Sequence, residues 1–151
     1  MSLANIFQIA SQGMTAQRER LETASANLAN ANTTRTAEGG PYRRRDVIFE
    51  TLPAANNDSP FAADFNSFDD NQPMALGVRA TTVVSGAANG VKHYQPGHPD
   101  ADKDGYLMMP DVDPLEETVN ILSAARAFEA NATAFNTAKD MARASLKLSE
   151  A

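Results

Sequence analysis

The chain has 151 residues, a net charge of −6 at pH 7 and no cysteine, which excludes disulfide bonds and thiolate metal sites. The acidic balance argues against a general nucleic-acid binder and against a basic protein of membrane surfaces. No run of 18 apolar residues is present for a membrane span, and no basic segment followed by an apolar core indicates a Sec signal peptide.

A long helix is predicted at the N-terminal end, from Ser2 as N-cap to about Asn30, where asparagine-rich sequence begins. Its side chains recur every seven residues, the pattern of a helix that packs against a partner helix. One heptad series is Phe7, Met14, Leu21 and Leu28, and beside it runs the series Leu3, Ala10, Gln17 and Ala24.

The end of this helix carries the motif Asn27-Leu28-Ala29-Asn30. Asparagine ends helices and enters turns readily, because its side chain bonds nearby backbone groups, and a helix end alone would explain the motif. The motif also resembles the N-terminal signature of the flagellar basal-body rod and hook proteins, in which a helix ends in the same four residues. Both interpretations are compatible with one structure.

Short strands are predicted in the middle of the chain, after a turn at Gly39-Gly40-Pro41. Residues 42–50 and 77–85 are rich in β-branched side chains, and residues 91–94 are a third candidate. These strands predict a small antiparallel hairpin or meander. Three adjacent basic residues in the first strand are a weak signal for phosphate or nucleic acid; a solvated strand or an acidic neighbouring subunit is favoured. They are Arg43, Arg44 and Arg45.

Residues 53–75 are predicted to form a mobile acidic loop, because Pro, Asn, Asp and Ser are abundant there. The loop contains Phe61, Phe65 and Phe68, whose spacing allows a short helix that docks on a partner. The segment resembles an insertion relative to the rod proteins, and the resemblance gives it no function.

Residues 100–111 match the pattern of an EF-hand calcium loop, with Gly105 at the sharp turn. The candidate oxygen ligands are Asp100, Asp102, Asp104 and Asp111. Pro96 and Gly97 precede the loop where an EF-hand needs a helix, and Pro110 restricts it. The alternative is a turn in which the aspartates accept bonds from local backbone N–H groups and Gly105 is left-handed.

A second long helix is predicted over residues 113–149, with Asp113 as N-cap, Pro114 at the first position and Glu116 reaching back to the capping N–H. One heptad series is Ile121, Phe128, Phe135 and Ala142, and the other is Ala125, Ala132 and Leu146, with Lys139 as its polar member. Leu115, Val119 and Leu122 are expected to widen this apolar stripe near the start.

The segment that leads into this helix resembles the same flagellar family more specifically than the heptads do. The matching residues include Pro96, Gly97, Gly105, Tyr106 and Pro110. The resemblance implies a structural subunit of the proximal rod of the basal body, which forms a homo-oligomer and also contacts other rod proteins and the basal-body base. It also implies export by the flagellar type III apparatus without a Sec signal, self-assembly in a rod that spans the periplasm, and a role in motility.

The predicted fold is mainly α, with the two terminal helices paired as an antiparallel coiled-coil-like hairpin and a small irregular middle region that contains a β-hairpin. Residues 2–32 and 112–150 are assigned to the helical rod core, and residues 33–111 to the middle region. No enzyme, cofactor, nucleic-acid partner or membrane insertion is expected, since His93 and His98 lie in Pro/Gly-rich sequence without a nucleophile motif. A small calcium-binding module at residues 100–111 is the alternative function.

Overall fold

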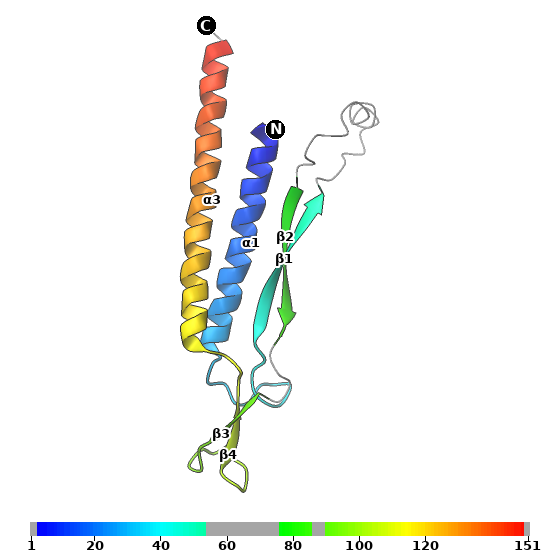
Figure 1. The fold of residues 1–151 in the computed structure, drawn as a ribbon, viewed down its shortest axis with the longest axis vertical. Helices are drawn as coiled ribbons and strands as arrows, with labels where there is room; N and C mark the ends of the chain where they lie inside the picture. Colours follow the sequence, from blue (N-terminus) through cyan, green and yellow to red (C-terminus); the bar gives the residue numbers. More distant parts are fainter. Residues whose placement is uncertain (1–2, 54–75, 86–89, 150–151) are drawn as a thin grey trace.

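The computed structural model describes residues 3–53, 76–85 and 90–149, and Figure 1 shows their arrangement. In chain order the elements are α1 (Leu3–Ala29), β1 (Arg45–Pro53), β2 (Leu76–Val84), β3 (Val91–Tyr94), β4 (Tyr106–Met109) and α3 (Pro114–Ser149). The two helices lie side by side, the β1–β2 sheet lies along α1, and β3 and β4 extend beyond the helices at one end (Figure 1). The fold is therefore mixed rather than mainly α.

The start of α3 forms as its sequence predicts. Asp113 Oδ1 accepts a hydrogen bond of 2.8 Å from the backbone N–H of Leu115, and the Asp113 carbonyl accepts the first helical bond from Glu117. Glu116 does not reach back to the cap, since both of its carboxylate oxygens accept bonds from Arg44 instead. A single N-cap bond therefore replaces the predicted capping box.

Helix α1 packs against α3 through aromatic and small side chains. The rings of Phe7 and Phe135 meet edge to face with centroids 5.0 Å apart. Further along α1, a Cβ on Gly13 would come within 2.9 Å of the Asn131 side chain, so the backbones approach closely at this level. The two helices can pack closely because small side chains line the interface. These include the buried side chains of Ala10, Ala24, Ala124 and Ala138.

The interface on α3 uses a series shifted by one residue from one of the two predicted series. Ala124 and Ala138 are buried, whereas Ala125 and Ala132 are half-buried. Ile121, Ala124, Phe128, Asn131, Phe135 and Ala138 follow an alternating spacing of three and four residues. Leu115, Val119 and Leu122 are exposed on the outer surface of α3 and do not widen this interface.

The β1–β2 hairpin packs on a second face of α1. Its antiparallel register places Arg45 opposite Val84. Two α1 side chains bond β2 directly: Gln12 Oε1 accepts from the Val78 N–H at 3.1 Å, and Glu19 Oε1 accepts from the Thr82 hydroxyl at 3.0 Å. The long polar side chains of α1 therefore hold the hairpin on the helix.

The β3–β4 hairpin forms a separate two-stranded sheet, in which Tyr94 lies opposite Tyr106. Both tyrosine rings are exposed and meet edge to face. The turn between the strands contains Gly105 at φ +79°, a left-handed conformation that favours glycine. Leu107 of β4 is buried, and the Thr34 hydroxyl donates to Asp100 Oδ2 in the turn at 2.8 Å, which ties the hairpin to the segment after α1.

The middle of the chain was predicted less completely than the helices. Strand β3 lies at residues 91–94 as predicted, β1 begins three residues later than expected, and β4 was not predicted. The proposed cap at Ser2 and the acidic loop with its phenylalanines, apart from residue 53, lie outside the described residues. In the part of the chain that the structure describes, no helix is long and apolar enough to cross a membrane.

Candidate functional site

The strongest candidate site is a joint at which the end of α1, the start of β1 and the start of α3 meet. Asn27, in the last turn of α1, is 1% exposed. Its Nδ2 donates to the Arg45 carbonyl at 2.7 Å, and its Oδ1 accepts from the Arg45 N–H at 3.0 Å. A side-chain amide thus satisfies both backbone groups of the first residue of β1.

Tyr42 completes the bonding of Asn27, because its hydroxyl donates to Asn27 Oδ1 at 3.0 Å. Burial raises the pKa of the Tyr42 phenol; nearby Arg45 opposes this rise, and Glu117 adds to it. The phenol therefore stays protonated and continues to donate at neutral pH. This bond joins the segment before β1 to the last turn of α1.

Arg44 links the same segment to the first turn of α3. Its Nη2 lies 2.9 Å from Glu116 Oε1, and its Nε lies 3.1 Å from Glu117 Oε1 and 3.3 Å from Asp46 Oδ1. The hydrogen bond that Arg44 donates to Glu116 is the main cause that raises the pKa of the Arg44 guanidinium, so this residue stays charged. One cation therefore faces three carboxylates from two elements.

The contact between Arg44 and Glu117 is an ion pair without a well-formed hydrogen bond. The Glu117 side chain is 2% exposed, yet neither its Oε1 nor the Arg44 Nε has a hydrogen-bond partner of good geometry. A carboxylate buried this deeply depends on the nearby cation for its stability. Arg20 strengthens the same junction by donating to Asn120 Oδ1 at 2.9 Å.

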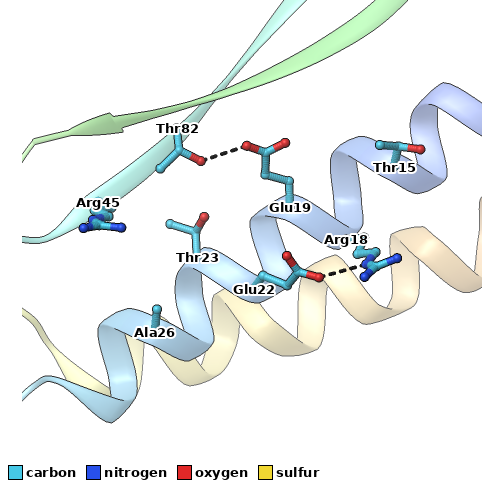
Figure 2. A pocket seen from close by; sticks show the side chains of 8 residues that line it. All are labelled: Thr15, Arg18, Glu19, Glu22, Thr23, Ala26, Arg45 and Thr82. Carbon is cyan, nitrogen blue, oxygen red and sulfur yellow. Dashed lines mark hydrogen bonds and ion pairs between the residues drawn. The ribbon is translucent and has the colours of Figure 1, made fainter.

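A polar groove of about 450 Å³ lies between α1 and the β1–β2 hairpin, and Figure 2 shows its lining. Two pairs of these side chains bond one another: Arg18 with Glu22 at 2.8 Å, and Thr82 with Glu19. The groove is open, and these acidic groups are engaged with neighbouring side chains. The arrangement supports a structural contact between helix and hairpin rather than catalysis.

The other residues of the helix-end motif end α1. Asn30 Nδ2 donates to the Ala26 carbonyl at 2.8 Å, and the same carbonyl also accepts the Asn30 backbone N–H at 3.1 Å. Leu28 is half-buried and Ala29 is exposed. Within this motif, Asn27 and Asn30 therefore have distinct roles, since one binds the next strand and the other closes the helix.

The second group of predicted signature residues shapes the β3–β4 hairpin. Gly105 and Pro110 are buried, whereas Pro96, Gly97 and Tyr106 are exposed. A Cβ on Gly105 would lie 3.0 Å from both Pro96 and Tyr94, so the turn has no room for a side chain there. These residues fix the turn and do not assemble a binding site.

The residues of the calcium-loop pattern form a local turn, as the alternative prediction stated. Asp102 Oδ1 accepts from the backbone N–H groups of Asp104 and Tyr106, and Asp100 Oδ2 accepts from the Thr34 hydroxyl. Strand β3 and a turn precede the loop, where an EF-hand requires its entering helix. Among the described residues, no cluster of His, Asp or Glu side chains has the geometry to hold a metal ion.

The outer surface of α3 exposes large apolar side chains near its first turns. Leu115 is 73% exposed, Val119 58% and Leu122 56%. Their spacing of four and three residues places them on one helical face, and we call these three side chains the α3 outer patch. Contiguous apolar side chains that face solvent are typical of protein contact surfaces.

In the single subunit, the residues that were predicted to pack between helices are buried to different degrees. Phe7, Met14, Leu21, Leu28, Ile121 and Phe135 are half-buried, as are Ala125 and Ala132. Phe128 is 38% exposed and Leu146 is 64% exposed. The α1–α3 contact therefore covers only part of the two apolar stripes.

The sequence did not predict the roles of Tyr42, Arg44 and Glu117. A glutamate in the first turn of a helix is explained by the helix dipole, so Glu117 gives no separate signal. Arg44 lies 73 residues before Glu117, and no local pattern relates them. The asparagine-rich helix end drew attention to Asn27 as a residue that ends the helix, but not to its bonds with Arg45.

Comparison with known proteins gives a consistent result over the whole chain. Residues 7–35 match the family described as flagella basal body rod protein, and residues 103–148 match the C-terminal family of flagellar basal body rod FlgEFG proteins. The chain is 40% identical to the flagellar basal-body rod protein FlgC of Borreliella burgdorferi, over 98% of each chain. It is 39% identical to FlgC of Escherichia coli O6:H1, in an alignment that covers 99% of this chain and all of the relative. It is 33% identical to FlgC of Bacillus subtilis, in an alignment that covers 98% of this chain and 99% of the relative.

Proposed function

Since the chain belongs to the FlgC family of flagellar basal-body rod proteins, we propose that it is a structural subunit of the proximal rod in the flagellar basal body. Its function is then to polymerise rather than to turn over a substrate. The observation that carries this proposal is the partial covering of its apolar helix faces, because the α3 outer patch and Phe128 remain exposed in the single chain.

The mechanism follows from the geometry of the two helices. We propose that α1 and α3 pair as an antiparallel coiled-coil-like hairpin, since Phe7 meets Phe135 while Arg20, later in α1, bonds Asn120, earlier in α3. The small side chains between the helices permit close approach. Neighbouring subunits would then bury the helix faces that this pairing leaves open.

The joint around Asn27 and Arg44 has a defined role in this account. It fixes the β1–β2 hairpin to the helix ends through bonds to Arg45, Glu116 and Glu117. A subunit that repeats in a rod must present its helices and its hairpin at one fixed angle, because every contact is repeated along the assembly. The joint would hold that angle.

The proposed partners are further copies of this chain, other rod proteins and the basal-body base. Export through the flagellar type III apparatus is part of the same proposal. The assembled protein would lie in the rod that spans the periplasm. The calcium-binding alternative is not retained, because Asp102 and Asp100 bond groups within the chain.

The experiment is deletion of the gene for this chain, followed by electron microscopy of purified basal bodies. We expect basal-body bases that lack a complete rod and cells that do not swim, both restored by the full-length chain. Complete rods and normal motility in the deletion strain would contradict the proposed function.

A further inference from the structure

Helix α1 contains a single glycine, Gly13, near its middle. Glycine weakens the interior of a helix, so its presence there needs a reason in the packing. A Cβ on Gly13 would lie 2.9 Å from Nδ2 and 3.2 Å from Cγ of Asn131 on α3. The Asn131 side chain therefore occupies the space that any larger residue at position 13 would need.

Gln17, one helical turn after Gly13, carries a second cost that its own contacts do not explain. Its Oε1 is buried, and no group in the described part of the chain bonds this oxygen. A buried carbonyl oxygen without a hydrogen-bond partner destabilises the folded state. A role other than stability is needed to explain Gln17.

Gln17 and Asn131 each lie between two buried alanines of the same heptad series. The alanines, seven residues away on either side, are Ala10 and Ala24 beside Gln17, and Ala124 and Ala138 beside Asn131. Identical alanines at intervals of one heptad would fit equally well if one helix slid seven residues along the other. The alanines alone therefore leave the register between the two helices undetermined.

The contact between Gly13 and Asn131 distinguishes one register from its neighbours. After a slip of one heptad in either direction, Asn131 would meet Ile6 or Arg20 in place of Gly13. Both of these residues carry large side chains, so neither leaves the space that Asn131 fills beside Gly13.

Gln17 distinguishes the same register. It lies between the Gly13–Asn131 contact and the Arg20–Asn120 bond, at about the level of the small residue Ala124 in the antiparallel pairing proposed above. A slip of one heptad would bring Gln17 to about the level of Asn131 or of Glu117. Two large polar side chains would then compete for the space that Gln17 now shares with an alanine.

We propose that Gly13, Gln17 and Asn131 set the register between α1 and α3, and we call these three residues the register key. A polar residue in an otherwise apolar helix interface is a known means of fixing register at some cost in stability. Here the cost is a glycine within α1 and the unbonded oxygen of Gln17. The inference rests on the antiparallel pairing in the proposed function, and it names the residues that select one offset.

The register determines which surfaces the subunit presents. A slip of one heptad would move α3 by about 10 Å along α1. It would separate Glu117 from Arg44, which now lie 3.1 Å apart, and it would change which part of the apolar stripe around Phe128 stays uncovered. The register key therefore makes every copy of the chain present the same faces.

The test measures the register directly with spin labels, which can be placed at chosen sites because the chain has no cysteine. The parent form of the full-length chain carries Ser25→Cys and Asn136→Cys, at exposed positions of α1 and α3. Pulsed electron paramagnetic resonance gives the distribution of distances between the two labels. A slip of one heptad changes the offset between them by about 10 Å.

Two variants of this parent are compared. The key variant adds Gln17→Ala and Asn131→Ala, which makes both heptad series uniform alanine at these positions. The control adds Arg18→Ala and Glu129→Ala, which remove two exposed side chains from the same helices. Alanine favours helix, so both variants should retain α1 and α3, which circular dichroism checks.

We expect one distance of roughly 30 Å in the parent and in the control. The key variant should show a second peak displaced by about 10 Å, because its alanines fit at more than one offset. A single peak at the parent distance in the key variant, or loss of its helical signal, would overturn the inference. A parent without a peak near 30 Å would overturn the antiparallel pairing as well. Failure of the proposed rod function would appear separately, as complete rods in the deletion strain.

Discussion

The side chain of Asn27 binds the backbone of Arg45 much as a neighbouring strand would, with Nδ2 donating at 2.7 Å and Oδ1 accepting at 3.0 Å. This pairing joins the end of α1 to the first residue of β1. The amide is buried, so water cannot replace either bond. Asn27 therefore fixes the start of β1 on the helix, while Gln12 and Glu19 hold β2.

Replacing Asn27 with Ala should lower the free energy of unfolding by about 2–4 kcal/mol, because it removes the buried amide that pairs the N–H and the carbonyl of Arg45. Asn32→Ala is the matched control: Asn32 is exposed in the following turn, and we expect a change within about 0.5 kcal/mol. Urea unfolding followed by circular dichroism measures both. Equal stabilities for the two variants would show that the Asn27 bonds contribute little.

Replacing Arg44 with Met should destabilise the chain by about 2–4 kcal/mol, since it leaves the buried carboxylate of Glu117 without its cation. Adding Glu117→Gln to this variant should restore part of the loss, because the amide carries no charge to compensate. The same unfolding measurement applied to both variants and to Glu117→Gln alone gives the coupling energy. Additive effects would mean that Arg44 and Glu117 act independently.

Gly105 and Gly97 offer a matched pair of substitutions in the same loop. Gly105→Ala should cost about 1–2 kcal/mol, because Gly105 has φ +79° and a new Cβ would lie 3.0 Å from Pro96 and Tyr94. Gly97→Ala should change stability by less than about 1 kcal/mol, since nothing lies within 4 Å of its Cβ position. Thermal unfolding distinguishes them. A larger loss at Gly97 would contradict the described turn.

Alkaline pH should destabilise the chain through Tyr42. Its pKa in the folded chain is raised above the usual 10.0, mainly by burial, so the folded state holds this proton more tightly than the unfolded state. The contribution of the protonated Tyr42 phenol to the free energy of unfolding is fully present below pH 10, and it is lost as pH rises through the pKa of the folded state. Tyr42→Phe should reduce the loss of unfolding free energy between about pH 9 and pH 11. Parallel pH dependences for both proteins would show that Tyr42 does not titrate differently on folding.

The sequence predicted the helices well because their signals are local. The Asp113 cap, the Pro114 start and the heptad spacing all lie within the segment that they describe. The choice between Ala124 and Ala125 at the interface was not predictable from composition, since both are alanine and either completes a heptad. The tertiary contact decides, and it buries Ala124.

The middle region was harder to predict because its structure depends on contacts between distant residues. The acidic run at residues 100–104 has the same composition whether it binds calcium or forms a turn, and the bonds of Asp102 to Asp104 and Tyr106 show the turn. Arg44 was interpreted as a solvated residue or a contact to a neighbouring subunit. It pairs within the chain instead, with glutamates on α3.

Substitution of Phe128 tests most directly the central claim that subunits assemble through their apolar helix faces. The residue belongs to the apolar stripe of α3 but remains 38% exposed beside α1. Phe128→Asp should therefore cost the isolated chain only about 1–2 kcal/mol, whereas an unpaired charge buried between subunits would cost several. The matched control is Glu129→Ala, an exposed neighbour on the same helix.

The measurement is the number of complete rods in basal bodies purified from a deletion strain that produces each variant, with the amount of exported subunit determined by immunoblot. The account predicts normal export of both variants, normal rods with Glu129→Ala and no complete rods with Phe128→Asp. Normal rods and normal motility with Phe128→Asp would contradict it, because the apolar stripe would then not be a packing surface of the assembled rod.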